Sequence, residues 1–175
     1  MIFALLLCFA NVAFAQTERE KGIELYEKGD YKAAAESLQK ATQTDSKDGE
    51  AWRFLGMAYA RTNELKKSAK AFGEADNFAD KDLNAGYDAP VEITSRGYPR
   101  FTEKSRLNQT MGIIKLAVEF GSDGKIKYVV TIRGLPDGLT ENAIKAASKI
   151  RFKPAVRNGK TVTVIAFLEY SFAIH

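Results

Sequence analysis

The sequence predicts an α+β chain in which an all-helical N-terminal part precedes a small domain of two helices and a three-stranded antiparallel sheet. Two observations predict this class. A 34-residue pattern occurs twice, over residues 15–48 and 49–82, and strand-like alternation of apolar and polar residues follows after residue 111. At 175 residues the chain is long enough for two small domains.

The first fifteen residues predict a secretory signal peptide. Residues 1–15 carry no charge and are nearly all apolar, and Ala13-Phe14-Ala15 matches a cleavage pattern, so Gln16 is expected to begin the mature chain. As a helix this run would reach about 22 Å, short of a hydrocarbon core of about 30 Å. We therefore expect a periplasmic protein. No Lys or Arg precedes the apolar run, so an uncleaved inner-membrane anchor is the alternative.

The residue types that most enzymes and metal sites need are nearly missing. The single cysteine, Cys8, lies in the leader, and the single histidine, His175, is the last residue. A Cys/His metal site and a Ser/His or Cys/His nucleophilic site therefore lack their side chains. The sequence predicts no catalytic residue, no metal, no cofactor and no enzymatic activity.

Charge is distributed unevenly between the two parts. Residues 98–175 hold 13 Lys and Arg against 6 Asp and Glu, whereas residues 16–97 hold 13 against 16. A basic domain can attract nucleic acid, an anionic envelope surface or an acidic peptide, or it can have a solvated basic face without a partner. A secretory leader argues against nucleic acid, so we predict a protein or peptide partner in the cell envelope.

The two copies of the N-terminal pattern align residue by residue. Gly22 falls on Gly56, and Leu38 falls on Phe72. The motif Trp52-x-x-Leu55-Gly56-x-x-Tyr59, with Ala69, Phe72 and Ala75, resembles the tetratricopeptide repeat. The first copy departs from that family by having Glu18 where the tryptophan stands. Because such arrays usually need three units, the exposed end of two repeats is expected to pack on the C-terminal domain, another copy or a partner.

The resemblance to tetratricopeptide repeats implies a peptide groove lined by the first helix of each repeat. The alternative is that these side chains are ordinary surface residues. The residues that would line the groove are Arg19, Ile23, Arg53, Met57 and Arg61.

Helical periodicity ends after residue 82. Residues 83–97 contain turn-forming residues and are predicted to be a linker, in which residues 90–93 form a weak edge strand. A short helix from Pro99 to Leu107 follows. Two alternating strands then flank the Asp123-Gly124 hairpin, a helix is capped by Thr140, and a third long strand runs from Thr161 to about Ile174.

This order of elements, over residues 98–175, resembles the C-terminal domain of TonB, which couples the inner membrane to outer-membrane transporters. The residues that carry the resemblance are Tyr98-Pro99, Asp123-Gly124, Arg151-Phe152-x-Pro154-Ala155 and Asn158-Gly159-Lys160. The chain departs from TonB in having four prolines and no Pro-rich spacer.

The resemblance implies that the last strand is a sheet edge that recruits a transporter peptide by strand addition. There are two alternatives. The same edge pairs with a second copy in a homodimer, or it has no partner and is protected by neighbouring charge. We predict a periplasmic adaptor; a membrane-anchored energy transducer and a structural protein that binds anionic polymer are the competing hypotheses. The candidate partner-binding residues are Tyr98, Pro99, Val162, Val164, Ala166, Leu168 and Tyr170.

Overall fold

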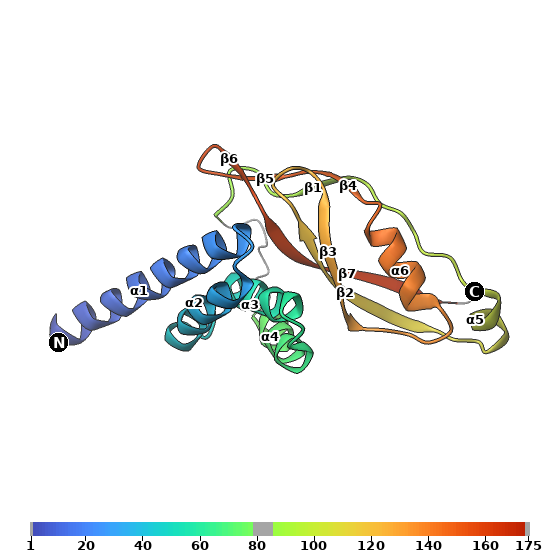
Figure 1. Ribbon diagram of the computed structural model, residues 1–175, viewed down its shortest axis with the longest axis horizontal. Coiled ribbons are helices and arrows are strands. Elements are labelled where there is room, and N and C mark those ends of the chain that lie inside the picture. Colours follow the sequence, from blue (N-terminus) through green and yellow to red (C-terminus); the bar gives the residue numbers. More distant parts are fainter. Residues whose placement is uncertain (1, 79–85, 174–175) are drawn as a thin grey trace. The chain divides into compact units, whose positions relative to one another are not determined.

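The computed structural model describes residues 2–78 and 86–173, with side chains from residue 14 onward. The chain divides into two compact units, residues 1–81 and 82–175, which we describe separately. The first unit is helical and the second contains all the described strands (Figure 1). The α+β class with a three-stranded antiparallel sheet is confirmed.

Four helices form the first unit as two antiparallel pairs. Their bounds are α1 (Ile2–Glu27), α2 (Tyr31–Thr44), α3 (Gly49–Arg61) and α4 (Leu65–Asn77). Aspartates begin two of them: Asp30 accepts a hydrogen bond from the Ala33 amide at 3.1 Å, and Asp48 accepts one from the Ala51 amide at 2.9 Å. These caps satisfy amides that have no partner inside the helix.

The equivalent glycines of the two repeats lie where helices approach most closely. A Cβ atom on Gly22 would lie 2.6 Å from Cγ of Leu38, and one on Gly56 would lie 2.7 Å from Cδ1 of Phe72. Both partner side chains are buried. The 34-residue periodicity therefore places a small residue against a large one at the same point of each helical pair.

Helix α1 extends across the end of the predicted leader. It runs through Ala15 and Gln16 without a break, so the predicted cleavage site lies inside a continuous helix. Cleavage itself stays a prediction. Among the helices that the structure describes, none is long and apolar enough to cross a membrane.

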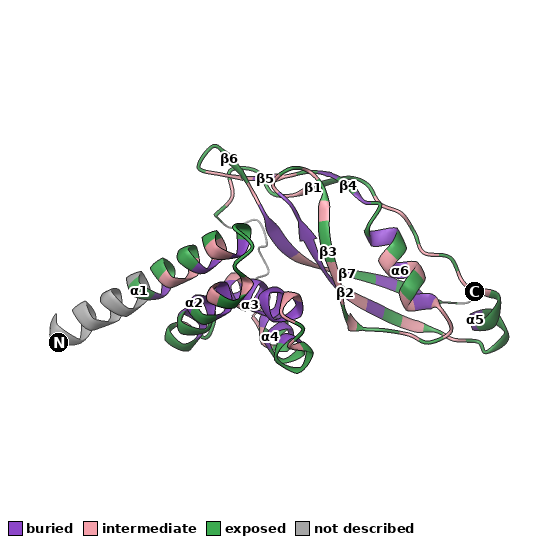
Figure 2. Ribbon diagram, viewed as in Figure 1, coloured by how far each residue is buried: buried purple, intermediate pink, exposed green. Residues whose placement is uncertain are grey.

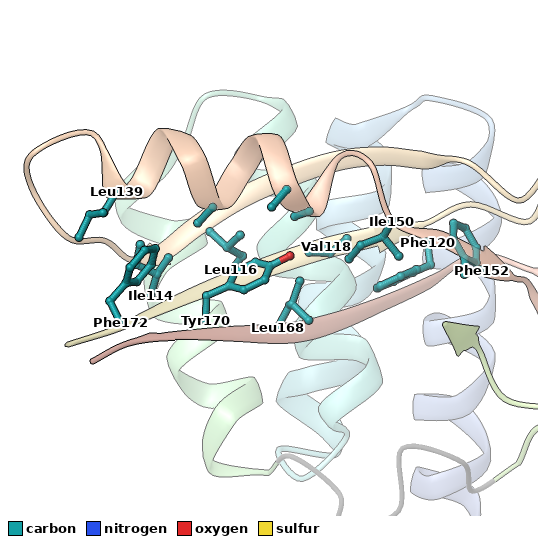
Figure 3. Packing of buried hydrophobic residues seen from close by; sticks show 13 residues of the cluster. Ile114, Leu116, Val118, Phe120, Leu139, Ile150, Phe152, Leu168, Tyr170 and Phe172 are labelled. Atoms are coloured by element: carbon teal, nitrogen blue, oxygen red, sulfur yellow. The ribbon is translucent and has the colours of Figure 1, made fainter. Parts of the chain in front are cut away.

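The second unit is built on a sheet with the strand order β3-β2-β7. Its strands are β2 (Gly112–Phe120), β3 (Ile126–Arg133) and β7 (Val164–Phe172), and both pairings are antiparallel. Helix α6 (Leu139–Ala147) covers one face of this sheet and encloses the apolar core with it (Figure 3). Strand β2, the central strand, is buried over most of its length, as its colouring in Figure 2 shows.

Two smaller pairings flank the main sheet. Strand β1 (Glu92–Ser95) pairs with β4 (Arg151–Lys153), and β5 (Ala155–Arg157) pairs with β6 (Lys160–Val162). Phe152 of β4 packs edge-on against Phe120 at 4.9 Å between ring centroids. The segment predicted as a linker, residues 83–97, therefore includes a strand that belongs to the C-terminal unit; residues 83–85 lie outside the described residues.

The predicted long strand from Thr161 to Ile174 is wrong in one respect, because it is two strands. Asn158 and Gly159 both have positive φ, 53° and 71°, as a two-residue hairpin turn requires, and this turn pairs β6 with β5. The chain then changes partners at Thr163, and β7 pairs with β2. Val162 therefore lies in the small hairpin and not in the main sheet, and Ile174 lies outside the described residues.

The short helix before the sheet also begins later than predicted. Helix α5 (Glu103–Leu107) starts after Thr102, whose hydroxyl accepts a hydrogen bond from the Ser105 amide while Ser105 caps the Thr102 amide in return. This reciprocal pair fixes the start of the helix at residue 103, four residues after Pro99.

Candidate functional site

Strand β7 lies at one edge of the main sheet. Its nine residues all pair with β2 in an unbroken register, from Gly112 with Phe172 to Phe120 with Val164. In the described part of the chain no other strand pairs with β7. A row of backbone groups therefore faces away from the sheet along its other side.

Arg96 shows which residues of β7 direct their backbone outward. Its guanidinium Nη2 donates a hydrogen bond to the carbonyl oxygen of Glu169, so that carbonyl faces away from β2. Alternate residues of an antiparallel strand direct their amide and carbonyl groups to the same side. Ile165, Phe167 and Ser171 therefore share the outward direction of Glu169, and the even-numbered residues bond to β2.

The guanidinium of Arg96 also lies over an aromatic ring. Its carbon Cζ is 4.9 Å from the ring centroid of Tyr170, which is 3% exposed. Figure 3 shows the Tyr170 hydroxyl among apolar side chains of the core. Burial raises the pKa of this hydroxyl above its ordinary value, against the smaller opposing effect of the Arg96 charge. Nε of Arg96 and Oη of Tyr170 are both buried, and the Arg96 guanidinium is the polar group beside this hydroxyl.

A cavity of about 200 Å³ adjoins the same stretch of β7. Its walls come from three places: the segment before and within β1, the end of β2, and the first half of β7. The lining residues are Tyr87, Pro90, Val91, Ile93, Phe120, Val164, Ala166, Phe167 and Leu168. The edge strand is thus flanked by an apolar cavity at one end and by a cation at the other.

Comparison with known proteins accounts for both units. Residues 97–174 match the family described as the Gram-negative bacterial TonB protein C-terminal, and residues 19–82 match the tetratricopeptide repeat. The chain carries tetratricopeptide repeats and a TonB C-terminal domain. Both families are non-enzymatic interaction domains, and domains of both kinds typically bind protein partners.

Two individual proteins illustrate these similarities. The solution NMR structure of the Pseudomonas aeruginosa TonB CTD is similar at 24% identity and a TM-score of 0.42, over 50% of this chain and 90% of that one. A TPR repeat-containing protein of Dictyostelium discoideum is 34% identical over 84 residues, which are 48% of this chain. This chain spans 31% of the length of that relative.

The predicted peptide-binding residues of the TonB domain occupy three different environments. Val164, Leu168 and Tyr170 lie on the core side of β7 and are buried, and Ala166 is partly buried there. Val162 belongs to the β5–β6 hairpin, as described above. Tyr98 is 80% exposed. Of this set, only side chains of β7 line the cavity, so its backbone and cavity, rather than all seven side chains, form the candidate site.

The predicted groove residues of the repeat unit do not share one environment either. Arg53 and Met57 are buried, and the other three are partly exposed. Arg19 pairs with Asp48 at 3.2 Å and so ties α1 to the start of α3. The guanidinium of Arg61 lies 5.1 Å from the ring centroid of Tyr31. A peptide groove on this unit stays a prediction.

A cavity of about 350 Å³ on the repeat unit was not anticipated. It lies between α2, α3 and α4, where the Tyr59 hydroxyl donates to the Gln39 side chain at 3.3 Å. Burial raises the pKa of that hydroxyl, while the charge of Lys67 opposes the shift. The lining residues are Gln39, Thr42, Gln43, Trp52, Leu55, Tyr59, Lys67, Lys70 and Ala71.

Arg96 was not predicted to take part in a site, nor were Tyr87 and the residues around Val91, because they fall in a segment that lacks periodicity. Its only sequence signal was the weak strand predicted at residues 90–93. For metals, no group of three His, Cys, Asp or Glu side chains comes together within the part of the chain that the structure describes.

Proposed function

We propose that this protein is a periplasmic adaptor of the Gram-negative cell envelope. Its tetratricopeptide unit holds one protein partner, and its TonB domain takes an extended peptide from another, such as an outer-membrane transporter. The peptide adds to the outer side of β7 as a further antiparallel or parallel strand. The observation that carries the proposal is that β7, nine residues long and regular, pairs on one side only among the described residues.

Strand addition uses the backbone groups that this edge presents. An added strand would exchange hydrogen bonds with the outward amides and carbonyls of Phe167 and Glu169, and these main-chain bonds give affinity that is nearly independent of sequence. Selectivity then depends on side-chain sites beside the edge. The apolar cavity next to β7 is such a site.

The same edge could also pair with β7 of a second copy. An antiparallel dimer of this kind would compete with the peptide, because both use the same backbone groups. Light scattering of the purified chain over a range of concentrations therefore precedes the binding experiments. A dimer that dissociates on adding peptide supports one shared edge.

Proline substitution separates the outer side of β7 from its inner side. Glu169→Pro removes an amide that faces outward, so we expect the domain to fold and peptide binding to be lost. Leu168→Pro removes an amide that bonds to β2, so we expect it to unfold the domain. Glu169→Ala is the matched control: it removes the half-exposed carboxylate that pairs with the largely buried Lys115 ammonium, keeps the outward amide, and should retain binding.

The test is isothermal titration of the full chain with peptides from candidate envelope partners, with circular dichroism to check folding. Binding by the wild type and by Glu169→Ala, with loss in a folded Glu169→Pro variant, is the expected result. Unchanged binding by a folded Glu169→Pro variant would refute addition at this edge.

A further inference from the structure

We infer that the end of the TonB domain that carries α5 docks on an anionic lipid surface. Leu107 and Met111 enter the boundary between headgroups and acyl chains, and Arg100 and Arg106 bind the lipid phosphates around them. This surface is separate from the outer side of β7, so the inference goes beyond the proposed addition of a peptide strand and does not depend on it.

Large apolar side chains are exposed together at this end of the domain. Leu107 is 79% exposed and Met111 is 55% exposed, and they stand four positions apart in the sequence. Met111 also lines an open cavity of about 620 Å³ with Phe101, whose ring packs edge-on against the buried ring of Phe172. Figure 1 shows α5 at one end of this unit. Grouped apolar side chains that face water indicate a docking surface.

The loop after α5 has its polar side chains turned inward and its apolar side chains turned outward. The hydroxyl of Thr110 and the amide of Asn108 both donate to the mostly buried carboxylate of Asp137, at 2.6 and 3.1 Å. These hydrogen bonds hold the loop, so Leu107 and Met111 cannot turn under the domain without breaking them. A fixed outward position lowers the conformational entropy that is lost on docking.

Cations surround the apolar side chains. Residues 98–113 contain three Lys and Arg and one acid, Glu103. Arg100 and Arg106 are exposed, and neither forms an ion pair within the part of the chain that the structure describes. Arg106 lines the same cavity as Met111. An arginine beside an exposed apolar side chain suits a phosphate that is attached to an acyl chain.

A lipid surface fits this end of the domain better than a protein does. A second copy would bring the same cations against one another, which opposes a dimer through this end. A peptide would need polar partners, and the side chains of Asn108 and Thr110 are already bonded to Asp137. An anionic bilayer supplies both the negative charge and the apolar layer, and it requires no matching shape.

The test places an environment-sensitive dye at position 107 and follows its emission as vesicles are added. Cys8, the single cysteine, is first removed by Cys8→Ser, and Leu107→Cys then carries the dye on the full chain. Vesicles of phosphatidylglycerol and phosphatidylcholine should shift the emission to the blue, and spin-labelled acyl chains should quench it. Vesicles of phosphatidylcholine alone should require at least about tenfold more lipid, because the cations lose their attraction to the surface.

Leu65→Cys, with the same dye and in the same background, is the matched control. Leu65 is also an exposed leucine, and it lies beside lysines at the start of α4 in the repeat unit. Its dye should keep the emission that it has in water when vesicles are added. Because each dye reports on its own surroundings, binding of the apolar residues 1–15 to lipid does not imitate the signal at position 107.

A double substitution, Arg100→Gln with Arg106→Gln, tests the cations in the chain labelled at position 107. We expect the lipid concentration at half-maximal signal to rise by about tenfold or more. Lys125→Gln with Lys127→Gln removes the same charge at the hairpin after β2, whereas α5 precedes β2. Nine residues of strand place that hairpin about 30 Å away, well beyond the screening length of about 10 Å, so this control should bind as the unaltered chain does.

Three results would overturn the inference. The first is an absence of any emission change at position 107 with anionic vesicles, and the second is an equal change with phosphatidylcholine alone. The third is a change that grows with protein concentration in the absence of lipid, because a second copy would then cover this end. None of these results concerns peptide binding at β7, so lipid docking and strand addition stand or fall separately.

Discussion

Gly56→Ala tests the close helix approach that the repeats are built on. The added Cβ would lie 2.7 Å from both Cδ1 and Cε1 of Phe72 and 3.0 Å from its Cγ. Ordinary carbon contacts begin near 3.5 Å, so α3 and the ring must separate by about 0.8 Å. Phe72 is 1% exposed, so its ring is held inside the core and cannot simply turn out into solvent.

The magnitude follows from two opposing effects. Overpacking a well-filled core lowers the free energy of unfolding by about 1–3 kcal/mol. Replacing a glycine inside a helix by alanine raises it by about 0.5–1 kcal/mol. We expect Gly56→Ala to lower the free energy of unfolding of the repeat unit by about 1–2 kcal/mol. Gly73→Ala is the matched control, because a Cβ there meets nothing within 4 Å, and it should raise that free energy by about 0.5–1 kcal/mol.

Urea unfolding of the full chain, followed by tryptophan fluorescence, measures this difference. The sequence has one tryptophan, Trp52, and it lies in α3, so its signal reports on the repeat unit alone. If Gly56→Ala stabilised the unit as much as Gly73→Ala does, the packing argument for the repeated glycines would be refuted.

Two further predictions concern single carboxylates. Hydrogen bonds from the Thr110 hydroxyl and, second, from the Asn108 amide lower the pKa of Asp137 in the folded protein. The ionised carboxylate therefore stabilises the fold at any pH above the pKa of an unfolded Asp, near 4. This stabilisation is lost as the pH falls through the lower pKa of the folded state. Asp137→Asn should therefore destabilise the TonB domain at pH 7 more than at pH 3 in urea titrations; an equal effect at both would contradict this. Asp48→Ala removes both the cap of α3 and the Arg19 ion pair, and should cost about 1–2 kcal/mol. Asp30→Ala removes a helix cap alone, so it should lower the free energy of unfolding by less than Asp48→Ala does in the same fluorescence assay. A larger loss for Asp30→Ala would contradict a contribution from the Arg19 ion pair.

Features that depend on neighbours along the chain were predicted correctly. The repeat pattern predicted both helical pairs, and the Asp123-Gly124 turn predicted the β2–β3 hairpin, because helix periodicity and turn chemistry act over a few residues. The change of strand partner at Thr163 was not predicted. Val162 and Val164 continue one alternation, so the pattern could not show that β6 and β7 pair with different strands.

The candidate site was predicted in the same uneven way. The last strand was expected to be a sheet edge because of the resemblance to TonB, and β7 pairs only with β2 among the described strands. Arg96 was not recognised, because its importance comes from Glu169, 73 residues further along the chain. No local pattern encodes such a contact.

The sequence by itself predicted the helical pairs of the repeats, the β2–β3 hairpin and the resemblance of each part to its family, since these follow from local periodicity, turn residues and motif spacing. Only the tertiary structure decided which strands pair, where the cavity beside β7 lies, and that Arg96 covers the Glu169 carbonyl. The physical reason is that these features join segments far apart in the chain, as in the ion pair of Glu92 with Lys153 across 61 residues. Their formation depends on how the whole domain buries its apolar surface.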